Sequence, residues 1–299
     1  MIMPELPEVE TVRLGLNKFL PGLKVKSVSF DWPKGFPNSK RLVDTKLIGS
    51  SILKVDRRGK VIIIPLSSGY SLLIHLKMTG QLVFTKDHDR FGAGHPNDSL
   101  VSKLPDRSTR VTFVFNDDAR LYFNDQRKFG WVKLEASNGL YENNAFLKKL
   151  GPEPLEKDYT YEQFRNALSS RKKSTIKAVI LDQTVLAGVG NIYADEGLFA
   201  ARIHPAEKVE NISQTKLRRL FKALIEIMSL SISLGGSSDR NYVDAEGKRG
   251  SYLKFAKVFR REGQDCPECG GKISKIRVAG RGTHVCNRCQ KLKTSIDKK

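Results

Sequence analysis

The chain has 299 residues and a mass of 33.6 kDa, more than one compact core usually holds, so two or three domains are expected. Its 52 lysines and arginines exceed its 32 acids, and the net charge of +20 makes polyanions the expected partners. No stretch approaches the ~18 uncharged apolar residues of a membrane span, and residues 1–10 lack the segments of a signal peptide, so membrane insertion and export are not expected.

Residues 1–135 predict one helix followed mainly by strands. Apolar residues recur at helical spacing from Val9 to Phe19, and Pro21 ends the segment. Short apolar runs bounded by turn residues predict strands at residues 61–64, 72–75, 81–84, 111–115 and 121–123. Short strands at regular spacing are typical of a sandwich or a barrel. The polar, glycine-containing stretch at residues 87–106 predicts a mobile loop.

Helical periodicity replaces the strand pattern beyond residues 151–154, where we expect a domain boundary. Thr160 and Gln163 form a capping-box pattern before a short helix. A longer helix is predicted to begin at Ser213 and to carry on one face Leu217, Leu220, Leu224 and Ile227. The pattern breaks at residues 235–238, and residues 244–250 predict a flexible loop.

The cysteines form two Cys-x2-Cys pairs separated by 16 residues: Cys266, Cys269, Cys286 and Cys289. This spacing is typical of a tetrahedral zinc ribbon, and a complete set of four thiolates predicts one structural Zn²⁺ ion rather than a catalytic one. The alternative is two disulfides, which are not expected because a basic intracellular protein is kept in a reducing environment. The tip of the ribbon is predicted at residues 279–282, with Arg281 pointing outward.

Much of the positive charge lies at the C-terminus. Residues 254–299 contain thirteen basic and four acidic residues, so +9 of the net charge is found there. We expect this end of the chain to contact phosphate. The alternative is a solubilising surface charge, and charge by itself identifies no reaction.

Short motifs spread over the whole chain resemble those of formamidopyrimidine-DNA glycosylases. They are residues 3–11, 58–60, 75–80, 125–130, 188–193, 235–238 and the cysteine ribbon. The resemblance implies an α+β multidomain fold with an N-terminal β-sandwich and flanking helix, a central helix-two-turn-helix domain and a C-terminal zinc ribbon. The implied bounds are 1–135 for the sandwich, 136–155 for a linker, 156–253 for the helical domain with a lesion-capping loop, 254–291 for the zinc finger and 292–299 for a basic tail.

The resemblance also implies an activity: a bifunctional DNA glycosylase and AP lyase of base excision repair that excises oxidised purines such as 8-oxoguanine and formamidopyrimidines. The implied partner is damaged double-stranded DNA, and the implied form is a monomer in the bacterial cytoplasm. In this family the amine of an N-terminal proline forms an imine with the sugar, and β,δ-elimination then cuts the strand. An α-amino group suits this step because its pKa near 8 leaves a fair fraction unprotonated at neutral pH.

By resemblance, Pro4 is the nucleophile, Glu5 is the general acid and base at the sugar oxygen, and Glu8 is a second acid in the lesion pocket. Without the resemblance, Pro4 and Pro7 only position a helix whose dipole favours acids in its first turn. A proline inside a peptide bond cannot form an imine, so catalysis requires removal of residues 1–3, and an inactive protein is the alternative. We expect translation to begin at Met3, with that methionine then removed.

Two basic residues resemble family residues that assist elimination. Lys60 resembles the family lysine that assists elimination on the 3′ side. The alternative is that Lys60, together with Arg57 and Arg58, only contacts phosphate. Arg281 resembles the finger-tip arginine that grips phosphate around the damaged nucleotide and is tied to the second elimination. Its planar guanidinium suits bidentate phosphate contacts.

A base flipped out of the duplex leaves a hole that the protein must fill. Met78, Arg127 and Phe129 resemble the void-filling trio of the family, although an apolar residue near a strand is more often part of a core. Asn191, which opens a helix after a glycine-rich turn, and Lys172 resemble contacts to the DNA backbone.

Two motifs depart from the family pattern. Lys77 stands where glycine is common, and residues 108–110 replace a histidine-containing run, which leaves Arg110 as a candidate phosphate contact.

Two alternative functions remain open: an endonuclease VIII-like enzyme that prefers oxidised pyrimidines, and a DNA-binding protein without catalysis. Leu6, the void-filling trio and the loop at residues 233–250 resemble the purine branch. A protein that only binds DNA does not need Glu5, Glu8 and Lys60 together.

Overall fold

The computed structural model describes residues 3–95, 97–237 and 251–292. The chain divides into two compact units, Met1–Lys148 with Ile232–Ser251, and Lys149–Ser231 with Tyr252–Lys299. Within the described part, no helix is long and apolar enough to cross a membrane. The loop predicted at residues 244–250 and the basic tail beyond Leu292 lie outside the described residues.

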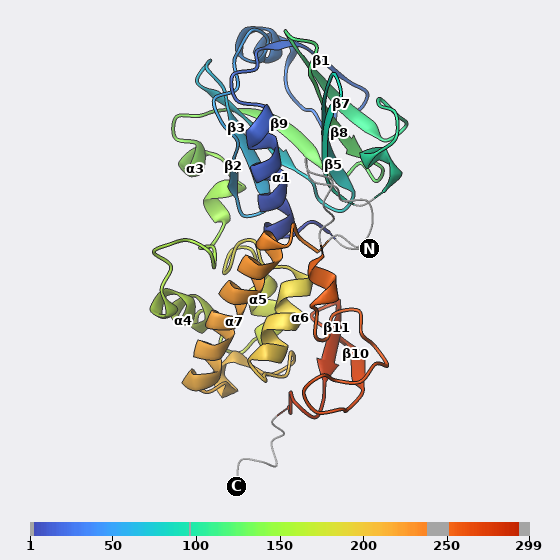
Figure 1. Ribbon diagram of the computed structural model, residues 1–299. Helices are drawn as coiled ribbons and strands as arrows, with labels where there is room; N and C mark the ends of the chain where they lie inside the picture. The colour runs from blue at the N-terminus through green and yellow to red at the C-terminus, as the bar shows by residue number, and fades with distance from the viewer. Residues whose placement is uncertain (1–2, 96, 238–250, 293–299) are drawn as a thin grey trace. The chain divides into compact units, whose positions relative to one another are not determined.

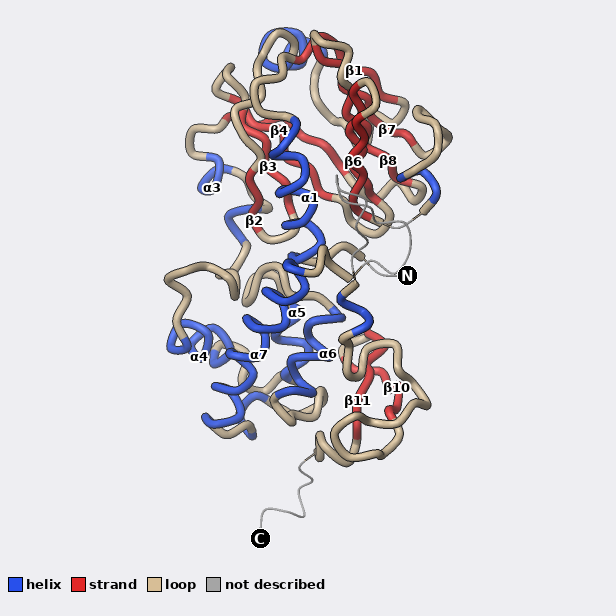
Figure 2. Tube along the Cα trace, in the orientation of Figure 1, coloured by secondary structure: helices blue, strands red, loops and turns tan. Residues whose placement is uncertain are grey.

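Two antiparallel sheets form the first unit (Figures 1 and 2). One sheet has the order β2 (Asp56–Arg58), β3 (Val61–Pro65), β4 (Tyr70–His75) and β9 (Trp131–Ala136). The other has the order β1 (Val25–Phe30), β7 (Thr109–Phe115), β8 (Arg120–Asp125), β5 (Gly80–Lys86) and β6 (Asp89–Gly94). Buried apolar side chains from both sheets form one core, so the predicted sandwich is confirmed.

Helix α1 (Leu6–Phe19) packs on the same core, as its apolar spacing predicts. Val9, Val12 and Leu16 are fully buried. Gly15 allows the helix to approach β6, because a Cβ atom at this position would lie 2.0 Å from the Phe91 ring. The packing therefore fixes the N-terminal turn of α1 relative to the sandwich.

The prediction of a mobile loop over residues 87–106 is wrong for its first part. Strand β6 occupies Asp89–Gly94 and pairs with β5 through a tight turn at Asp87 and His88. Phe91 and Ala93 are buried in the core. Most residues of this segment are polar, so the sequence gives little indication that Phe91 and Ala93 are buried. Their burial stabilises the hairpin.

The second unit is helical up to residue 231, as predicted. Its helices are α4 (Tyr161–Ser169), α5 (Ile176–Leu181), α6 (Asn191–Ala200) and α7 (Gln214–Ser233), the last of which ends in the first unit. The capping box of α4 is present, with Gln163 N donating to Thr160 Oγ1 at 3.3 Å. On α7 Leu217, Leu220 and Leu224 are buried as predicted, whereas Ile227 is half-buried and the buried face continues at Met228, four residues after Leu224.

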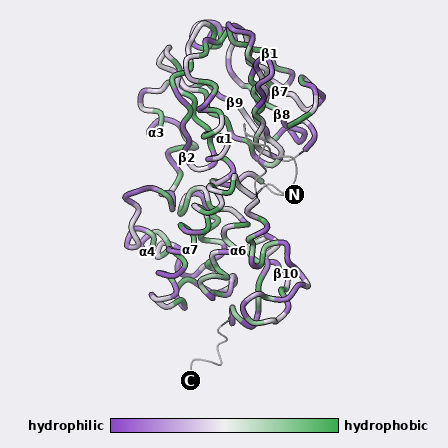
Figure 3. Tube along the Cα trace, viewed as in Figure 1, coloured by the Kyte–Doolittle hydropathy of each residue, from purple (hydrophilic) through white to green (hydrophobic). Residues whose placement is uncertain are grey.

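A two-stranded hairpin of β10 (Ile273–Val278) and β11 (Arg281–Cys286) completes the second unit. Its turn consists of Ala279 and Gly280, both with positive φ. Figure 3 shows that hydrophobic and hydrophilic residues are mixed along both units, and β3 is apolar and buried from Val61 to Ile64. The short elements are α2 (Lys40–Leu42), a π turn (Val43–Leu47), α3 (Leu140–Asn143) and 3₁₀ turns at Asp98–Leu100, Leu147–Lys149, Val209–Asn211 and Tyr252–Lys254.

Candidate functional site

The first turn of α1 carries three of the predicted catalytic residues. Pro4 and the two acids Glu5 and Glu8 are buried, and Glu5 caps the helix. The Glu5 amide donates to Glu8 Oε2 at 2.9 Å, while Ser237 N donates to Glu8 Oε1 at 2.9 Å. Gly236, at φ +91°, brings this backbone against Glu8. Glu8 thus holds both the segment next to Pro4 and the backbone at Ser237, and residues 238–250 of the predicted capping loop lie outside the described residues.

Lys60 lies in the tight turn between β2 and β3 and is only 7% exposed. Gly59 supplies the positive φ that this turn requires. Arg57 Nε donates to Glu10 Oε2 of α1 at 2.9 Å, and its Nη1 donates to Gly59 O at 3.0 Å. The side chain of Arg57 therefore joins the turn that bears Lys60 to helix α1.

Glu10 accepts the hydrogen bond by which Arg57 joins helix α1 to the turn between β2 and β3, a contact called the junction below. Burial raises the pKa of its carboxyl, but hydrogen bonds from Arg13 and Arg57 outweigh that effect and hold the pKa below its usual value. Glu10 therefore stays ionised at neutral pH, and the junction stays intact.

His75, at the end of β4, was given no role from the sequence, although it begins the motif at residues 75–80. Its ring lies 5.7 Å from the rings of both Trp131 and Phe146. Burial, followed by the charges of Lys77 and Lys60, lowers the pKa of His75 to about 3. Its Nδ1 accepts from Lys77 N at 3.0 Å, so the neutral ring carries its proton on Nε2.

The predicted void-filling residues lie on two loops that are hydrogen-bonded to each other. Met78 is in the turn between β4 and β5, and Arg127 and Phe129 are in the loop between β8 and β9. Thr79 Oγ1 accepts from Arg127 N at 3.0 Å and donates to the carboxylate of Asp125. The two loops that carry the trio are therefore joined through Thr79, the residue that follows Met78.

Asp125 organises the second of these loops and was also missed from the sequence. Its side chain is fully buried and accepts from Phe129 N at 2.8 Å and from Gly130 N at 2.7 Å. Phe129 itself is 51% exposed, and the guanidinium of Arg127 lies 4.6 Å from the centre of its ring. A rigid, buried anchor thus presents an exposed aromatic ring and a cation side by side.

Arg110 is buried beneath the same loop. Its Nε donates to Ser108 O at 3.0 Å and to Asp125 O at 3.1 Å, and its Nη atoms contact Asp31 and Arg107 O. These partners lie within the unit, so the placement favours a structural role. The predicted phosphate contact stays a prediction.

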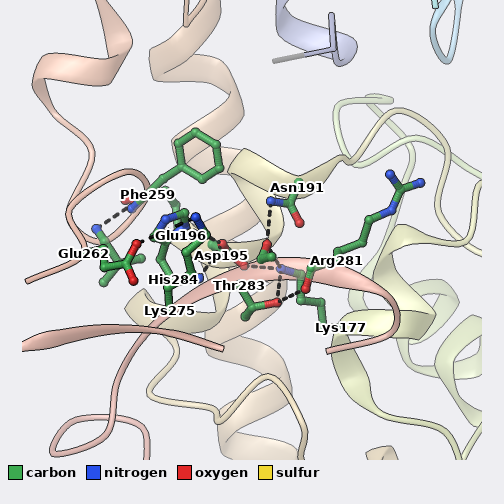
Figure 4. Close-up of polar contacts among 12 residues, drawn as sticks. Lys177, Asn191, Asp195, Glu196, Phe259, Glu262, Lys275, Arg281, Thr283 and His284 are labelled. Atoms are coloured by element: carbon green, nitrogen blue, oxygen red, sulfur yellow. Dashed lines mark hydrogen bonds and ion pairs between the residues drawn. The ribbon is translucent and has the colours of Figure 1, made fainter. Parts of the chain in front are cut away.

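In the second unit, Asn191 and Arg281 are brought close together (Figure 4). Asn191 Nδ2 donates to Gly282 O at 3.0 Å, and Arg281 is the exposed first residue of β11. The guanidinium of Arg281 extends away from the surrounding hydrogen bonds (Figure 4). Lys172 is exposed in the turn between α4 and α5.

The four cysteines converge as the zinc ribbon predicts. The Sγ atoms of Cys266, Cys269, Cys286 and Cys289 all lie within 4.8 Å of one another. Cys286 N donates to Gln290 Oε1 at 3.0 Å, and Gln290 Nε2 donates to Ile203 O at 2.8 Å. A set of four thiolates at this separation fits one tetrahedral Zn²⁺ ion with a structural function.

Sequence profiles of three domains match the chain. The formamidopyrimidine-DNA glycosylase N-terminal domain matches residues 3–132, the formamidopyrimidine-DNA glycosylase H2TH domain matches 150–242, and the zinc finger found in FPG and IleRS matches 263–292.

Curated relatives are similar over their full length. A formamidopyrimidine-DNA glycosylase from Pelotomaculum thermopropionicum is 40% identical, with 97% of this chain and 100% of the relative covered. One from Listeria innocua is 38% identical with the same coverage.

Solved structures of Lactococcus lactis Fpg are similar in fold. A complex with abasic-site DNA has a TM-score of 0.84 at 34% identity, covering 96% of this chain and 99% of that one. A point mutant bound to Fapy-dG DNA has a TM-score of 0.84 at 35% identity, covering 96% and 100%. A third complex, with oxidised-pyrimidine DNA, has a TM-score of 0.82 at 34% identity and covers the same shares.

Proposed function

The chain belongs to the formamidopyrimidine-DNA glycosylase family, and from that premise we propose that it is a bifunctional DNA glycosylase and AP lyase of base excision repair acting on oxidised purines. The observation that carries the proposal is the first turn of α1. There Pro4 adjoins two buried acids, and Glu8 uses both carboxylate oxygens to hold the neighbouring backbone. Buried, hydrogen-bonded groups of this kind keep a reacting centre in one geometry.

In the proposed reaction, the amine of Pro4 attacks the anomeric carbon of the damaged nucleotide, and the bond from that carbon to the base breaks. The amine loses its proton, and the sugar ring opens to give an imine. Glu5 is proposed to donate a proton to the ring oxygen and to accept protons later. Elimination then breaks the 3′ and afterwards the 5′ carbon–oxygen bond, with Lys60 proposed to assist the first and Arg281 the second.

Glu8 is proposed to support the lesion pocket. The void-filling role is proposed for Met78, Arg127 and Phe129, and the hydrogen bonds between their two loops support it. Backbone contacts to DNA are proposed for Asn191, Lys172 and Arg281, which lie at a helix N-terminus or on exposed turns. The zinc ion has no step in the reaction, because a complete thiolate set leaves it no position for a reacting group.

We propose a monomer that acts on damaged double-stranded DNA in the bacterial cytoplasm, in keeping with the bacterial sources of its relatives. The domain bounds 1–135, 136–155, 156–253, 254–291 and 292–299 are proposed on the same family resemblance. Oxidised pyrimidines are a second candidate substrate class, which is favoured by the L. lactis Fpg complex with oxidised-pyrimidine DNA.

The test is borohydride trapping, which reduces an imine to a stable covalent bond. A chain whose N-terminus is Pro4 should become covalently linked to DNA that contains 8-oxoguanine or an abasic site, and Pro4→Gly should trap far less. Equal trapping by a chain that retains Met1 and Ile2 refutes the proline mechanism. Single-turnover excision of 8-oxoguanine and of thymine glycol from matched duplexes then decides between the two substrate classes.

A further inference from the structure

Helix α6 and strand β11 meet in matching register (Figure 4). Asn191 and Asp195 are four residues apart on the helix, a rise of about 6 Å. Gly282 and His284 are two residues apart on the strand, a rise of about 6.6 Å. Asn191 Nδ2 donates to Gly282 O at 3.0 Å, and His284 N donates to Asp195 Oδ2 at 2.9 Å. Because the two spacings match, both contacts form together and fix the strand along the helix axis.

Lys177 of α5 completes this contact from the other side. Its Nζ donates to Asp195 Oδ1 at 2.6 Å and to Thr283 Oγ1 at 2.7 Å. Both charged side chains are fully buried. One oxygen of Asp195 therefore neutralises a buried ammonium, while the other holds the backbone of β11.

The network ends one residue from a proposed phosphate contact. Arg281 directly precedes Gly282, whose carbonyl oxygen accepts from Asn191. The distance between the guanidinium of Arg281 and the amide of Asn191 thus depends on where β11 lies along α6. A shift of the strand by one residue would move Arg281 by about 3.3 Å, more than a hydrogen bond tolerates.

The finger has separate anchors that do not involve Asp195. Glu196 accepts backbone hydrogen bonds from Lys257, Val258 and Phe259 at 2.7–2.9 Å, and Gln290 donates to Ile203 O. These anchors keep the finger in place when Asp195 is replaced, so the replacement weakens only the contact between β11 and α6.

We propose that Asp195 is a positioning residue that holds Asn191 and Arg281 as a single phosphate clamp. The inference rests on the proposed function, since it concerns the grip on DNA. Asp195 is fully buried, so it does not contact DNA itself and affects the two contacts through β11. The two proposed phosphate contacts consequently work as a unit, and each depends on the carboxylate.

The test is a double-mutant cycle on the full, zinc-loaded chain with Asp195→Asn and Arg281→Ala. Asparagine turns an NH₂ group toward Lys177 or toward His284 N, so one contact is replaced by opposed donors. Affinity is measured for a duplex with a tetrahydrofuran abasic-site analogue over a series of salt concentrations. Each single variant should bind about tenfold more weakly. In each variant the plot of log binding constant against log salt concentration should also be less steep by about 0.9, the value for one phosphate contact.

The double variant should bind no more weakly than the weaker single variant, because both changes disable the same clamp. Glu262→Gln is the matched control, since this carboxylate lies on the same finger and makes an exposed 3.7 Å ion pair with Lys275. It should bind like the wild type. Losses that multiply to about a hundredfold in the double variant overturn the proposal.

A second double variant tests whether the loss of affinity comes only from misfolding caused by an unpaired buried charge. Lys177→Met with Asp195→Leu removes both buried charges together and leaves neither one unpaired. This chain should retain one zinc per molecule and show the same loss of affinity and slope, and wild-type affinity here overturns the proposal. The proposed function fails separately, if the wild-type chain itself has no preference for abasic-site DNA.

Discussion

The buried carboxylate of Asp125 offers a direct test of how the loop that carries Arg127 and Phe129 is held. Asp125→Asn keeps the size of the side chain and one oxygen acceptor. If that oxygen stays with Thr79 and Arg127, the new NH₂ group faces the amides of Phe129 and Gly130, which now donate at 2.8 and 2.7 Å. Two hydrogen bonds to a charged acceptor are lost.

Each such bond contributes about 1.5–3 kcal/mol, so the loss is about 3–6 kcal/mol for an unrelaxed loop. The measured change in the free energy of unfolding should be smaller, because Arg127 and Phe129 are exposed and their loop can turn its amides toward water. The remaining cost appears as disorder of the loop. Phe129 is then no longer held in one position, and the proposed void filling fails.

Urea denaturation and single-turnover excision measure the two consequences. Asp125→Asn should unfold at lower urea concentration and release 8-oxoguanine from a duplex at least tenfold more slowly, while cleavage at a ready-made abasic site falls less. Asp117→Asn is the matched control, because its carboxylate is exposed and its ion pair with Lys86, at 2.5 Å, lies on the surface. Wild-type stability and excision in Asp125→Asn would falsify this reasoning.

Three further changes test the site. Glu5→Gln should still bind lesion DNA but lose base release in single-turnover assays, and unchanged release excludes the proposed proton transfer. Cys286→Ser should lower the zinc content measured by mass spectrometry and abolish DNA binding while the N-terminal unit stays folded; full affinity without metal contradicts the structural zinc. His75 has a folded pKa of about 3, below the unfolded 6.5, so its stabilisation is complete above pH 6.5 and lost as pH falls toward 3. From pH 7 to pH 5 the wild type should lose about 2 kcal/mol more than His75→Asn in urea titrations, and equal losses refute the shift.

The parts of the fold that local chemistry determines could be predicted from the sequence. The capping box at Thr160, the apolar runs of β3 and β4, and the cysteine spacing each depend on neighbouring residues. Strand β6 was missed because its burial depends on pairing with β5 and on the space that Gly15 leaves beside α1.

The supporting residues of the site could not be predicted, because their partners are distant in the chain. Asp125 meets Thr79 across 46 residues, and Lys177 meets Thr283 across 106. In the sequence, Asp125 and Lys177 cannot be distinguished from the charged residues of a solvated surface. Only burial distinguishes them, and burial is a property of the assembled fold.

Lys77 shows how a departure from the family pattern acquires a physical meaning. Its φ of +51° is the left-handed conformation that favours glycine, the residue common here in the family that the chain resembles. The strained backbone costs about 1–2 kcal/mol for a side chain with a Cβ atom, whereas glycine costs about 0.5–1 kcal/mol through the entropy of the unfolded chain. Lys77→Gly should therefore stabilise the fold slightly.

A comparison of Lys77→Gly with Lys77→Ala isolates the backbone contribution. Both variants remove the ammonium, which lies 5.9 Å from the Phe146 ring, and both remove its effect on the pKa of His75. They differ in the Cβ atom alone. The free energy of unfolding of Lys77→Gly should be about 0.5–1 kcal/mol higher than that of Lys77→Ala. In a helix the alanine variant would be the more stable one. A more stable alanine variant in urea titration would mean that the turn adjusts without strain, and that the lysine is tolerated because the position has no conformational demand.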